Sequence, residues 1–504
     1  MGWRESMAVI WHRKTLIMLC LGFSAGIPIL LIFSSLSLWL REAGVERATV
    51  TFFSWAALGY SFKFVWAPLV DRLPLPVLSA WLGRRRSWLL VSQLLVMTAI
   101  AGMAQVDPAS SEHALVVMAG FAVMLGFSSA TQDIVIDAYR IESADVRLQA
   151  VMASSYIAGY RLGMIVAGAG ALFLAAYWGS TAHGYSYEAW RWTYWCMVAA
   201  MGVGVVTTLS IAEPSVALRE PESQRHHARL LVVFLLTVVA FVTTFYQLGT
   251  PLHTVTEALH WGAAGQLLGA TVRLGLSIGA AYLAGRLLVR LGVVPVAVAK
   301  VTWVAPVADF FERYGASTAW LILALIGLYR ISDIVLGVIS NVFYQDMGFT
   351  KPEIAAAVKT FGVLVSILGG FLGGVLANRF GVMRSLMWGG ILSAGTNVMF
   401  VGLANAGHDL NWLYAVVAAD NLAAGLASAA FVAFLSSLTQ VSFTAVQYAI
   451  FSSLMTLLPK TLGGYSGSMV DAMGYPWFFV LTALLGLPVL VLVVMAGRRL
   501  ALRD

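Results

Sequence analysis

Long apolar runs alternate with short polar loops along almost the whole chain. A helix needs about 20 mostly apolar residues to cross a bilayer, and fourteen segments of the sequence meet that requirement. Six lie in the first half, at about 15–40, 49–70, 87–106, 114–139, 149–178 and 190–212. Two follow at 229–250 and 262–290, and six close the chain at 318–345, 352–378, 383–405, 411–438, 444–470 and 475–497. This pattern predicts an all-α polytopic membrane protein.

The spacing of these segments divides the chain into three parts. We expect an N-terminal six-helix bundle at 1–212 and a C-terminal six-helix bundle at 317–504. Between them, residues 213–316 combine a polar linker, two additional transmembrane helices and an amphipathic connector at about 293–316. Two related bundles that rock against each other are typical of secondary transporters.

Composition agrees with a membrane protein. Hydrophobic residues make up 60% of the chain, charged residues 11%, and the mean hydropathy is +0.83. A soluble domain carries about a quarter charged residues. The first apolar segment is longer than the core of a cleavable signal peptide, so we interpret it as an uncleaved span. Cys20 and Cys196 both lie inside apolar segments, which gives no indication of a disulfide framework.

Motifs of enzymes and of cofactor binding are weak or missing. The run Gly22-Phe-Ser-Ala-Gly26 matches the nucleophile elbow of serine hydrolases, but that elbow needs a strand before the serine. Here the run lies within an apolar helix, so we interpret its glycines as a close helix–helix contact. The same applies to Gly159 with Gly163 and to Gly369 with Gly373. The sequence has no Walker phosphate-binding loop and no metal-ligand spacing of histidines, so we expect no enzyme, cofactor or metal site.

Positive charges are distributed unevenly between the loops. Of the 31 Lys and Arg residues, we place 21 on the side of the N-terminus, 4 on the opposite side and 6 within spans. Lys and Arg accumulate in cytoplasmic loops, so we expect both termini in the cytoplasm. The net charge of +7 then reflects topology, and we expect no nucleic-acid partner.

A polar loop occurs twice, after the second segment of each predicted bundle. The first copy reads Ala67-Pro-Leu-Val-Asp-Arg72 and the second reads Gly374-Val-Leu-Ala-Asn-Arg-Phe-Gly381. An acid at one helix end can interact with the positive N-terminus of a neighbouring helix, which contributes about 0.3–1 kcal/mol when exposed. We therefore predict a cytoplasmic gate made of Asp71, Arg72 and Arg140 in the first bundle, mirrored by Asn378, Arg379 and Arg384 in the second.

Several bases lie within the predicted spans, namely Lys63, Arg161, Arg273, Arg330, Lys359 and Lys460. A base at mid-bilayer costs about 2.5–3.5 kcal/mol on insertion scales, so it normally faces a cavity or a partner. All except Arg273 lie in the two bundles, and their excess of positive charge points to an anionic substrate. Two alternatives stay open: Arg330 pairs with Asp333 on the same helix, or Lys63 extends to the cytoplasmic surface. For Arg273 we expect packing or pairing within the additional helices.

The fourth span carries the densest polar run, residues 128–140. Asp133 and Asp137 are four positions apart and therefore share one helix face. Burial and a neighbouring carboxylate both favour the protonated form of such an acid. We expect these two acids to serve proton coupling, with Asp133 carrying the proton.

The sequence also suggests which residues surround Asp133. We expect Gln132 and Arg161 to help hold the substrate beside it. The alternative is structural pairing of Asp137 with Arg140 and of Asp133 with Arg161. If Asp133 is not the proton site, Asp137, Asp333 and Asp420 are the next candidates.

Taken together, these motifs resemble the major facilitator superfamily and, within it, the AmpG-type muropeptide permeases. The first resemblance rests on the repeated polar loop, in which Ala67 stands where the family usually has Gly. The second rests on the segments 22–28, 63–72, 130–140, 308–315, 359–362 and 369–374, and it covers essentially the whole chain. It implies the major facilitator fold, here with about fourteen transmembrane helices.

The resemblance implies proton-driven import of anhydro-muropeptides, GlcNAc-1,6-anhydroMurNAc and its peptides, across the bacterial inner membrane for cell-wall recycling. In some bacteria such import feeds β-lactamase induction. Carboxylates of the peptide stem would suit Arg161, Lys359 and Lys460, and sugar faces would suit aromatic side chains. The candidate substrate site comprises these three bases with Tyr60, Lys63, Gln132, Tyr156, Tyr160, Arg330, Asp333, Asp420, Gln447 and Tyr448.

Two alternatives to this function remain. The chain could transport another organic anion, such as an acetyl-CoA-like or siderophore-like solute. It could also be a membrane sensor that binds muropeptide without moving it, although we find no soluble output domain for such a role. We expect a monomer whose partners are the anionic sugar-peptide, protons and the lipid bilayer.

Overall fold

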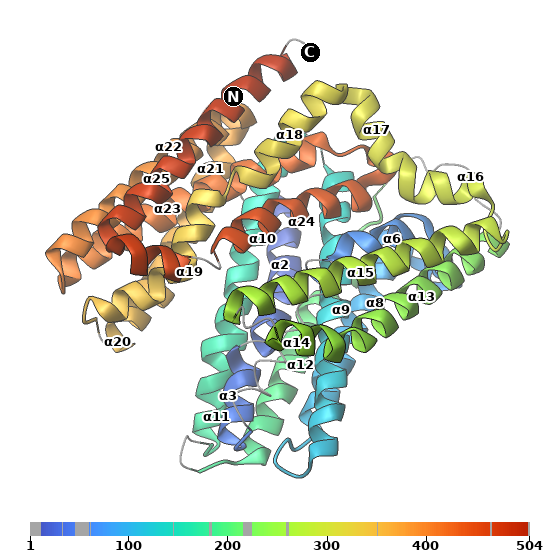
Figure 1. Cartoon of the computed structure of the whole chain (residues 1–504), viewed down its shortest axis with the longest axis horizontal. Helices are drawn as coiled ribbons and strands as arrows, with labels where there is room; N and C mark the ends of the chain where they lie inside the picture. Colours follow the sequence, from blue (N-terminus) through green and yellow to red (C-terminus); the bar gives the residue numbers. More distant parts are fainter. Residues whose placement is uncertain are drawn as a thin grey trace. The chain divides into compact units, whose positions relative to one another are not determined.

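The computed structural model describes residues 12–32, 34–45, 60, 62–144, 146–180, 184–214, 224–258, 262–349, 351–463 and 466–501. Its regular elements are helices (Figure 1). Within these ranges, 12 helices are long and apolar enough to cross a membrane. Of the other two predicted spans, most of 49–70 lies outside the described residues, and 262–290 forms a helix with those bounds.

The N-terminal bundle is built from five long helical spans that pack on one another. These are α2 (Arg13–Ile32) continued by α3 (Ser34–Glu42), α8 (Arg84–Ala104), α9 (Glu112–Ser143), α10 (Val146–Ile165) continued by η4 (Val166–Gly170) and α11 (Ala171–Tyr177), and α12 (Tyr187–Ser210). The described end of the second span contains η3 (Lys63–Val65) and α6 (Ala67–Arg72), and α7 (Leu78–Leu82) precedes α8.

The C-terminal bundle contains six spans. They are α18 (Ala316–Leu328) with α19 (Ile331–Asp346), α20 (Lys351–Ile354) with η6 (Ala355–Phe361) and α21 (Gly362–Phe380), α22 (Val382–Ala406), α23 (Leu410–Leu438), η7 (Val441–Phe443) with α24 (Thr444–Gly463), and α25 (Ser466–Ala501). The long α25 bends at Gly474, whose φ of 76° suits a residue without a Cβ atom.

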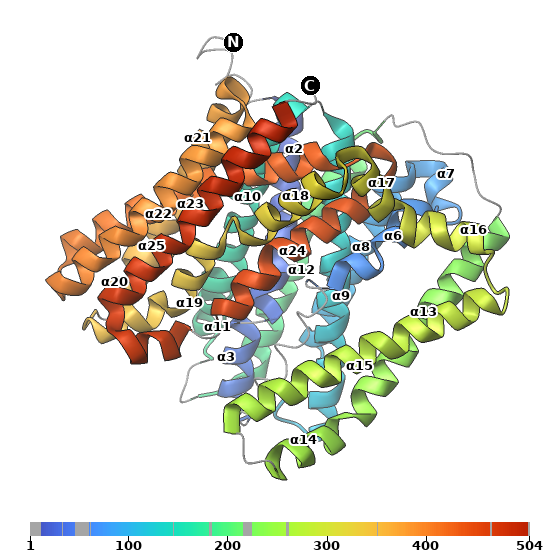
Figure 2. The same ribbon diagram turned by 45° about the horizontal axis from the view of Figure 1, so that its top comes forward.

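The additional helices form a separate unit, residues 217–313 together with 68–73. In this unit α13 (Gln224–Gln247), α14 (Gly249–Ala258) and α15 (Gly262–Arg290) pack on one another, as Figure 2 shows for α13 and α15. They are followed by α16 (Val296–Ala299), η5 (Lys300–Val304) and α17 (Ala305–Tyr314). Our domain boundaries at 212 and 316 stay a prediction.

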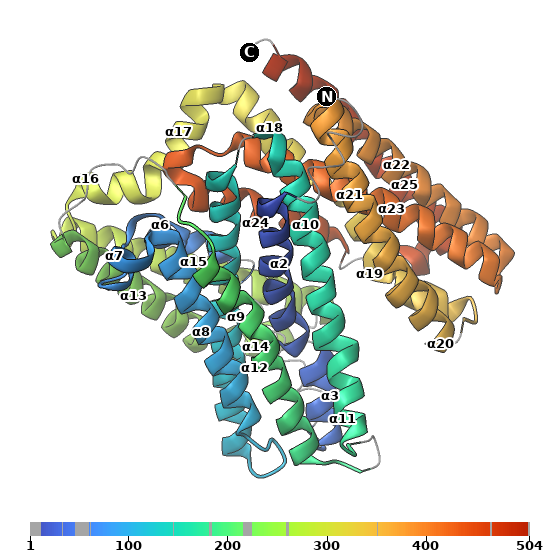
Figure 3. The same cartoon turned by 180° about the vertical axis from the view of Figure 1, so that it is seen from behind.

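Glycines allow helices to approach closely inside the N-terminal bundle. A Cβ atom at Gly22 would overlap the backbone carbonyl of Tyr156, and one at Gly159 would overlap the carbonyl of Leu19. Gly26 and Gly163 repeat the arrangement one turn further along. The predicted small-residue contacts thus join α2 to α10, which lie side by side in Figure 3.

The basic run after α7 connects three helices of the same bundle. Arg85 donates to Glu142 on α9 from Nε at 2.9 Å, and its guanidinium is almost fully buried. The Glu213 carboxylate accepts hydrogen bonds from the backbone N–H groups of Arg85 and Arg86 at 2.8 and 3.0 Å, which satisfies the N-terminus of α8. Glu142 and Glu213 therefore hold the basic run in place at the start of α8.

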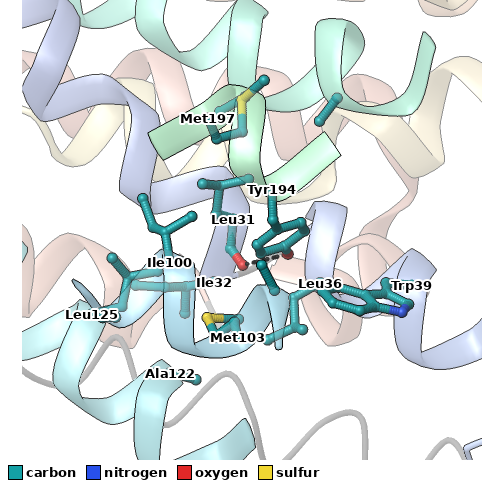
Figure 4. Close-up of a cluster of buried hydrophobic side chains, with 14 of the residues drawn as sticks. Leu31, Ile32, Leu36, Trp39, Ile100, Met103, Ala122, Leu125, Tyr194 and Met197 are labelled. Carbon is teal, nitrogen blue, oxygen red and sulfur yellow. Dashed lines mark hydrogen bonds between the residues drawn. The ribbon is translucent and has the colours of Figure 1, made fainter. Parts of the chain in front are cut away.

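A dense apolar cluster lies in the part of the N-terminal bundle away from Arg85, and Figure 4 shows its side chains. Trp39 and Trp190 stack with ring centroids 5.7 Å apart. The Tyr194 hydroxyl donates to the backbone carbonyl of Leu31 at 3.3 Å, so the one polar group of this side chain is satisfied. This cluster forms the apolar core at the end of the bundle away from Arg85.

Candidate functional site

The polar face of α9 brings two acids and two bases together. Asp133 and Asp137 are both buried, with exposed fractions of 8% and 7%. Lys63, at the start of η3, is also buried, and its Nζ lies 3.9 Å from Oδ2 of Asp137. The other oxygen of Asp137 lies 3.3 Å from Nη2 of Arg140. We call Lys63, Asp133, Asp137 and Arg140 the acid–base cluster.

Lys63 therefore does not extend to the surface as one of our alternatives supposed. Its alkyl chain is held within the protein, where an ion pair with Asp137 offsets part of the cost of burying the ammonium group. The pairing of Asp137 with Arg140, our alternative for that acid, is present in the structure.

Asp133 has different partners from those expected. The Tyr156 hydroxyl donates to its Oδ1 at 3.2 Å, and its charged neighbours are Lys63 and Asp137. Our pairing of Asp133 with Arg161 is therefore not seen. The reason is the α-helical geometry of α10, in which Tyr156 and Arg161 are five positions apart and point in different directions.

Arg161 instead faces the C-terminal bundle. Its charged neighbour is Arg330, and the two guanidinium groups repel each other. Arg161 has no hydrogen bond or ion pair to another described residue, and Nε of Arg330 has no hydrogen-bond partner there either. Two repelling cations from different bundles form an arrangement that an anion would stabilise.

A second group of charges lies in the C-terminal bundle. Arg330 Nη2 lies 3.5 Å from Oδ2 of Asp333, so the pairing that we left open is present. Asp420 on α23 interacts with Asp333, Arg330 and Thr396. Each bundle therefore holds one pair of acids with at least one base beside it.

Aromatic residues expected to contact sugar lie around the first acid pair. The rings of Tyr156 and Tyr160 are 6.0 Å apart, and the Tyr60 hydroxyl is 2.5 Å from Oγ of Ser129. Tyr60 and Tyr160 both interact electrostatically with Asp133. Tyr448, on α24, is instead buried, and the centre of its ring lies 5.2 Å from Cζ of the Arg140 guanidinium.

Two glutamines from our substrate site have structural roles here. Gln132 is fully buried and donates from Nε2 to Ser24 Oγ at 2.9 Å, because it lies on the α9 face turned towards α2. Gln447 accepts the backbone N–H of Gln440 at 2.7 Å and so stabilises the connection before α24. Oε1 of Gln132 has no hydrogen-bond partner among the described residues. The predicted substrate contact of both glutamines stays a prediction.

The side chains of Lys359 and Lys460 lie outside the described part of the structure. Their backbones belong to η6 and α24. Their proposed contact with peptide carboxylates stays a prediction.

Arg140, one of the predicted gate residues, contacts the opposite bundle. Its side chain is fully buried, and Nη1 donates to Ser436 Oγ on α23 at 2.7 Å. The same nitrogen donates to Gln149 Oε1 at 3.1 Å. Nearby, Ser154 on α10 donates to the carbonyl of Gly370 on α21 at 2.6 Å, which joins the two bundles a second time.

The other predicted gate residues are placed as follows. Asp71 is buried at the end of α6, and Arg72 donates to Thr302 Oγ1 at 3.1 Å within the unit of the additional helices. Neither polar side-chain atom of Asn378 has a hydrogen-bond partner among the described residues. Arg379 lies over the ring of Phe380, and Arg384 is exposed on α22. Their gating role stays a prediction.

Arg273 behaves as a packing residue of the additional helices. Its Nε donates to the carbonyl of Phe245 at 2.6 Å, and its guanidinium lies 3.9 Å from the centre of that ring. The cation is thus stabilised locally by a carbonyl and an aromatic face.

Sequence reasoning missed Gln149 and Ser436. Gln149 also donates to the backbone carbonyls of Arg140 and Ala144, at 3.0 and 2.8 Å, and so fixes the loop between α9 and α10. The position of Gln149 just after a polar turn could have indicated that its side chain caps backbone groups of that turn. Ser436 lies 296 positions from Arg140, and nothing in the sequence indicates that contact. Among the described residues, no cluster of His, Cys, Asp and Glu could hold a metal ion.

Comparison with known proteins identifies the class. A sequence profile of the Major Facilitator Superfamily matches residues 15–331. The solved structure of the proton:xylose symporter XylE bound to 6-bromo-6-deoxy-D-glucose superimposes with a TM-score of 0.57 at 13% identity, covering 95% of this chain and 94% of that one. The human organic anion transporter MFSD10 gives 0.51 at 14% identity, covering 98% and 100%. At these identities the structures show the fold alone.

Sequence relatives narrow the class further. The anhydromuropeptide permease of Escherichia coli K12 is 30% identical over 497 residues, covering 98% of this chain and 82% of the relative. A Rickettsia conorii transporter named AmpG 4 is 30% identical over 470 residues, covering 93% of both chains. The chain therefore belongs to the major facilitator superfamily and, within it, to the AmpG-type permeases. This is a family of multi-pass membrane transporters rather than enzymes.

Proposed function

We propose that this chain imports anhydro-muropeptides, GlcNAc-1,6-anhydroMurNAc and its peptide-bearing forms, from periplasm to cytoplasm. The observation that carries the proposal is the 30% identity to the Escherichia coli anhydromuropeptide permease along 98% of this chain. Import would supply cell-wall recycling and, where the host has an inducible β-lactamase, the signal for induction.

The chemistry of the substrate supports this assignment. Peptide stems carry carboxylates, and Arg161 and Arg330 provide two guanidinium groups from opposite bundles whose mutual repulsion a carboxylate would reduce. Anhydro-sugars present apolar faces, and the paired rings of Tyr156 and Tyr160 lie on the same helix as Arg161. A sugar and a carboxylate on one molecule would therefore contact α10 together.

We further propose that protons drive this import, with Asp133 as the site that binds the coupling proton. Asp133 is buried, has a second acid four positions away on α9, and accepts a hydrogen bond from Tyr156. Lys63 takes the place that we had given to Arg161 as the neighbouring base. Proton uptake at Asp133 and release on the other side would link the proton gradient to alternating access.

We place the protein in the bacterial inner membrane as a monomer, with both termini in the cytoplasm. The asymmetry of Lys and Arg between the loops supports this orientation. On this topology the contacts of Arg140 and Ser154 lie at the cytoplasmic ends of the bundles.

Uptake into vesicles tests the proposal. Membrane vesicles containing the chain should accumulate labelled GlcNAc-anhydroMurNAc and its tripeptide form when an inward proton gradient is imposed. A protonophore should abolish accumulation, and empty vesicles provide the control. Binding without any uptake would favour the membrane-sensor alternative, and no binding of either compound would favour a different organic anion.

A further inference from the structure

Arg140 joins the acid–base cluster to the contact between the two bundles. One end of its guanidinium, Nη2, lies 3.3 Å from Oδ1 of Asp137 in the N-terminal bundle. The other end, Nη1, donates to Ser436 Oγ in the C-terminal bundle at 2.7 Å. The Tyr448 ring, also in the C-terminal bundle, lies 5.2 Å from its central carbon. A single fully buried side chain therefore contacts an acid of one bundle and two residues of the other.

Asp137 is shared between two cations. Its Oδ2 lies 3.9 Å from Nζ of Lys63, while its Oδ1 holds Arg140. With Asp133 also ionised, the four members of the acid–base cluster are balanced in charge. The groups that face Asp137 are Lys63 from η3, Asp133 and Arg140 from α9, Tyr156 from α10 and Tyr448 from α24.

From this geometry we propose that Asp137 transmits the protonation state of the acid–base cluster to the contact between the bundles, by holding Arg140 against Ser436 and Tyr448. The inference rests on the proposed proton-driven import and assigns Gln149 and Ser436 as positioning residues of that cycle.

The direction of the effect follows from the charges. When Asp133 binds a proton, Asp137 is the one ionised carboxylate left for Lys63 and Arg140, and the two cations compete for it. Arg140 then loses part of its anchor. A proton on Asp137 itself removes that anchor directly. In both cases Arg140 is less well oriented towards Ser436, and the cytoplasmic ends of the bundles separate more easily.

Gln149 provides Arg140 with further hydrogen bonds in this arrangement. Its Oε1 accepts from Nη1 of Arg140 at 3.1 Å, and its Nε2 donates to the backbone carbonyls of Arg140 and Ala144. The guanidinium is therefore held from its own chain as well as by Asp137. When Asp137 no longer holds Arg140, the hydrogen bond from Arg140 to Ser436 is less well oriented. A small change in charge can in this way shift the equilibrium between the closed and the open packing of the bundles.

Distance measurement between the bundles tests the inference. Spin labels on Ser210→Cys at the end of α12 and Ala316→Cys at the start of α18 report separation of the ends, in a background without the two native cysteines. The purified full chain is measured without substrate in alkaline and in acidic buffer. We expect the open fraction to rise on acidification, because protonation weakens the Arg140 contact.

The variants separate the role of each residue. Asp137→Asn should be open in both buffers and lose the pH response. Ser436→Ala should raise the open fraction about ten-fold or more in alkaline buffer, the effect expected for losing a hydrogen bond to a charged group, and Ser436→Thr should restore it. Ser437→Ala is the matched control, because the Ser437 hydroxyl donates to the carbonyl of Phe434 on its own helix.

The outcomes distinguish this inference from the proposed function. A wild-type pH response in Asp137→Asn, or no shift in Ser436→Ala, overturns the inference even if muropeptide uptake is normal. If the distances respond as expected but muropeptide is neither bound nor imported, the substrate assignment fails and the inference stands. If Asp137→Asn does not fold, the comparison of Ser436→Ala with Ser436→Thr decides.

Discussion

At the scale of single residues, the buried charges carry the functional argument. Removing one partner of a buried ion pair costs about 3–5 kcal/mol, because the other charge is left without compensation. Lys63, Asp137 and Arg140 are all buried, so each depends on the others. Asp133 and Arg161 differ from them, since neither has an ion pair among the described residues. Their charges are therefore available for a proton and for a substrate anion.

Asp133→Asn should abolish accumulation driven by a pH gradient and preserve exchange of substrate between the two sides. The amide can still accept the Tyr156 hydrogen bond but cannot bind and release a proton. Gradient-driven uptake and counterflow in vesicles are the measurements. Glu188→Gln, an exposed acid at the start of α12, is the control and should change neither. Continued accumulation against a gradient in Asp133→Asn would move the proton site to Asp137, Asp333 or Asp420.

Arg161→Ala should weaken binding of the peptide-bearing substrate about ten- to hundred-fold, as expected for losing a hydrogen bond to a charged group. The bare disaccharide lacks the peptide carboxylates, so its affinity should change much less. Titration of both ligands into purified protein measures the difference. Equal losses for the two ligands would show that Arg161 does not recognise the peptide stem.

At the scale of helices, close approach between α2 and α10 positions the site. The carbonyls of Tyr156 and Tyr160 lie against Gly22 and Gly26, so the residues whose side chains surround Asp133 also form the helix contact. Without a hydrophobic driving force between helices in lipid, such contacts depend on van der Waals packing of small residues. A shift of α10 would therefore move Tyr156 away from Asp133.

Gly159→Ala should lower stability by about 1–3 kcal/mol, because the added methyl group overlaps the backbone carbonyl of Leu19 and α10 must move. Gly202→Ala on α12 is the matched control, since a Cβ atom there meets nothing within 4 Å. Thermal unfolding of the detergent-solubilised variants, followed by loss of the monodisperse peak, measures the difference. Similar midpoints for the two variants would refute a tight α2–α10 contact.

At the scale of the whole molecule, the two bundles form one compact unit and the additional helices form another. Both bundles belong to one unit, joined by Arg140 to Ser436 and by Ser154 to Gly370. Residues 217–313 form the other unit with 68–73. The helices of the bundles carry the buried acids and bases proposed for transport, while Arg273 in α15 is bound to its own neighbours.

Topology gives a prediction at this scale. A cysteine at Arg225 should be labelled by an impermeant thiol reagent only after the cells are opened, because we place the linker in the cytoplasm. A cysteine at Ser110, between α8 and α9, should be labelled in intact cells and serves as the control. Labelling of Arg225→Cys from outside would invert the proposed orientation.

The sequence by itself determined the class of fold and most of its spans. A hydrophobic stretch of bilayer length must form a helix in lipid, whatever it packs against, because each backbone polar group needs a partner within its own segment. That is why α15 has the predicted bounds, 262–290, and why Asp133 and Asp137 share a face of α9. Spacing along one helix follows from local geometry.

Only the tertiary structure decided which helices face each other. Arg161 lies near Arg330 rather than Asp133, and Gln132 contacts Ser24 on α2. Arg140 meets Ser436, 296 positions away. Such pairings depend on how each helix is rotated and packed, which is fixed by glycine contacts and by the sum of many small interactions along the interface. No local pattern in the sequence contains that rotation.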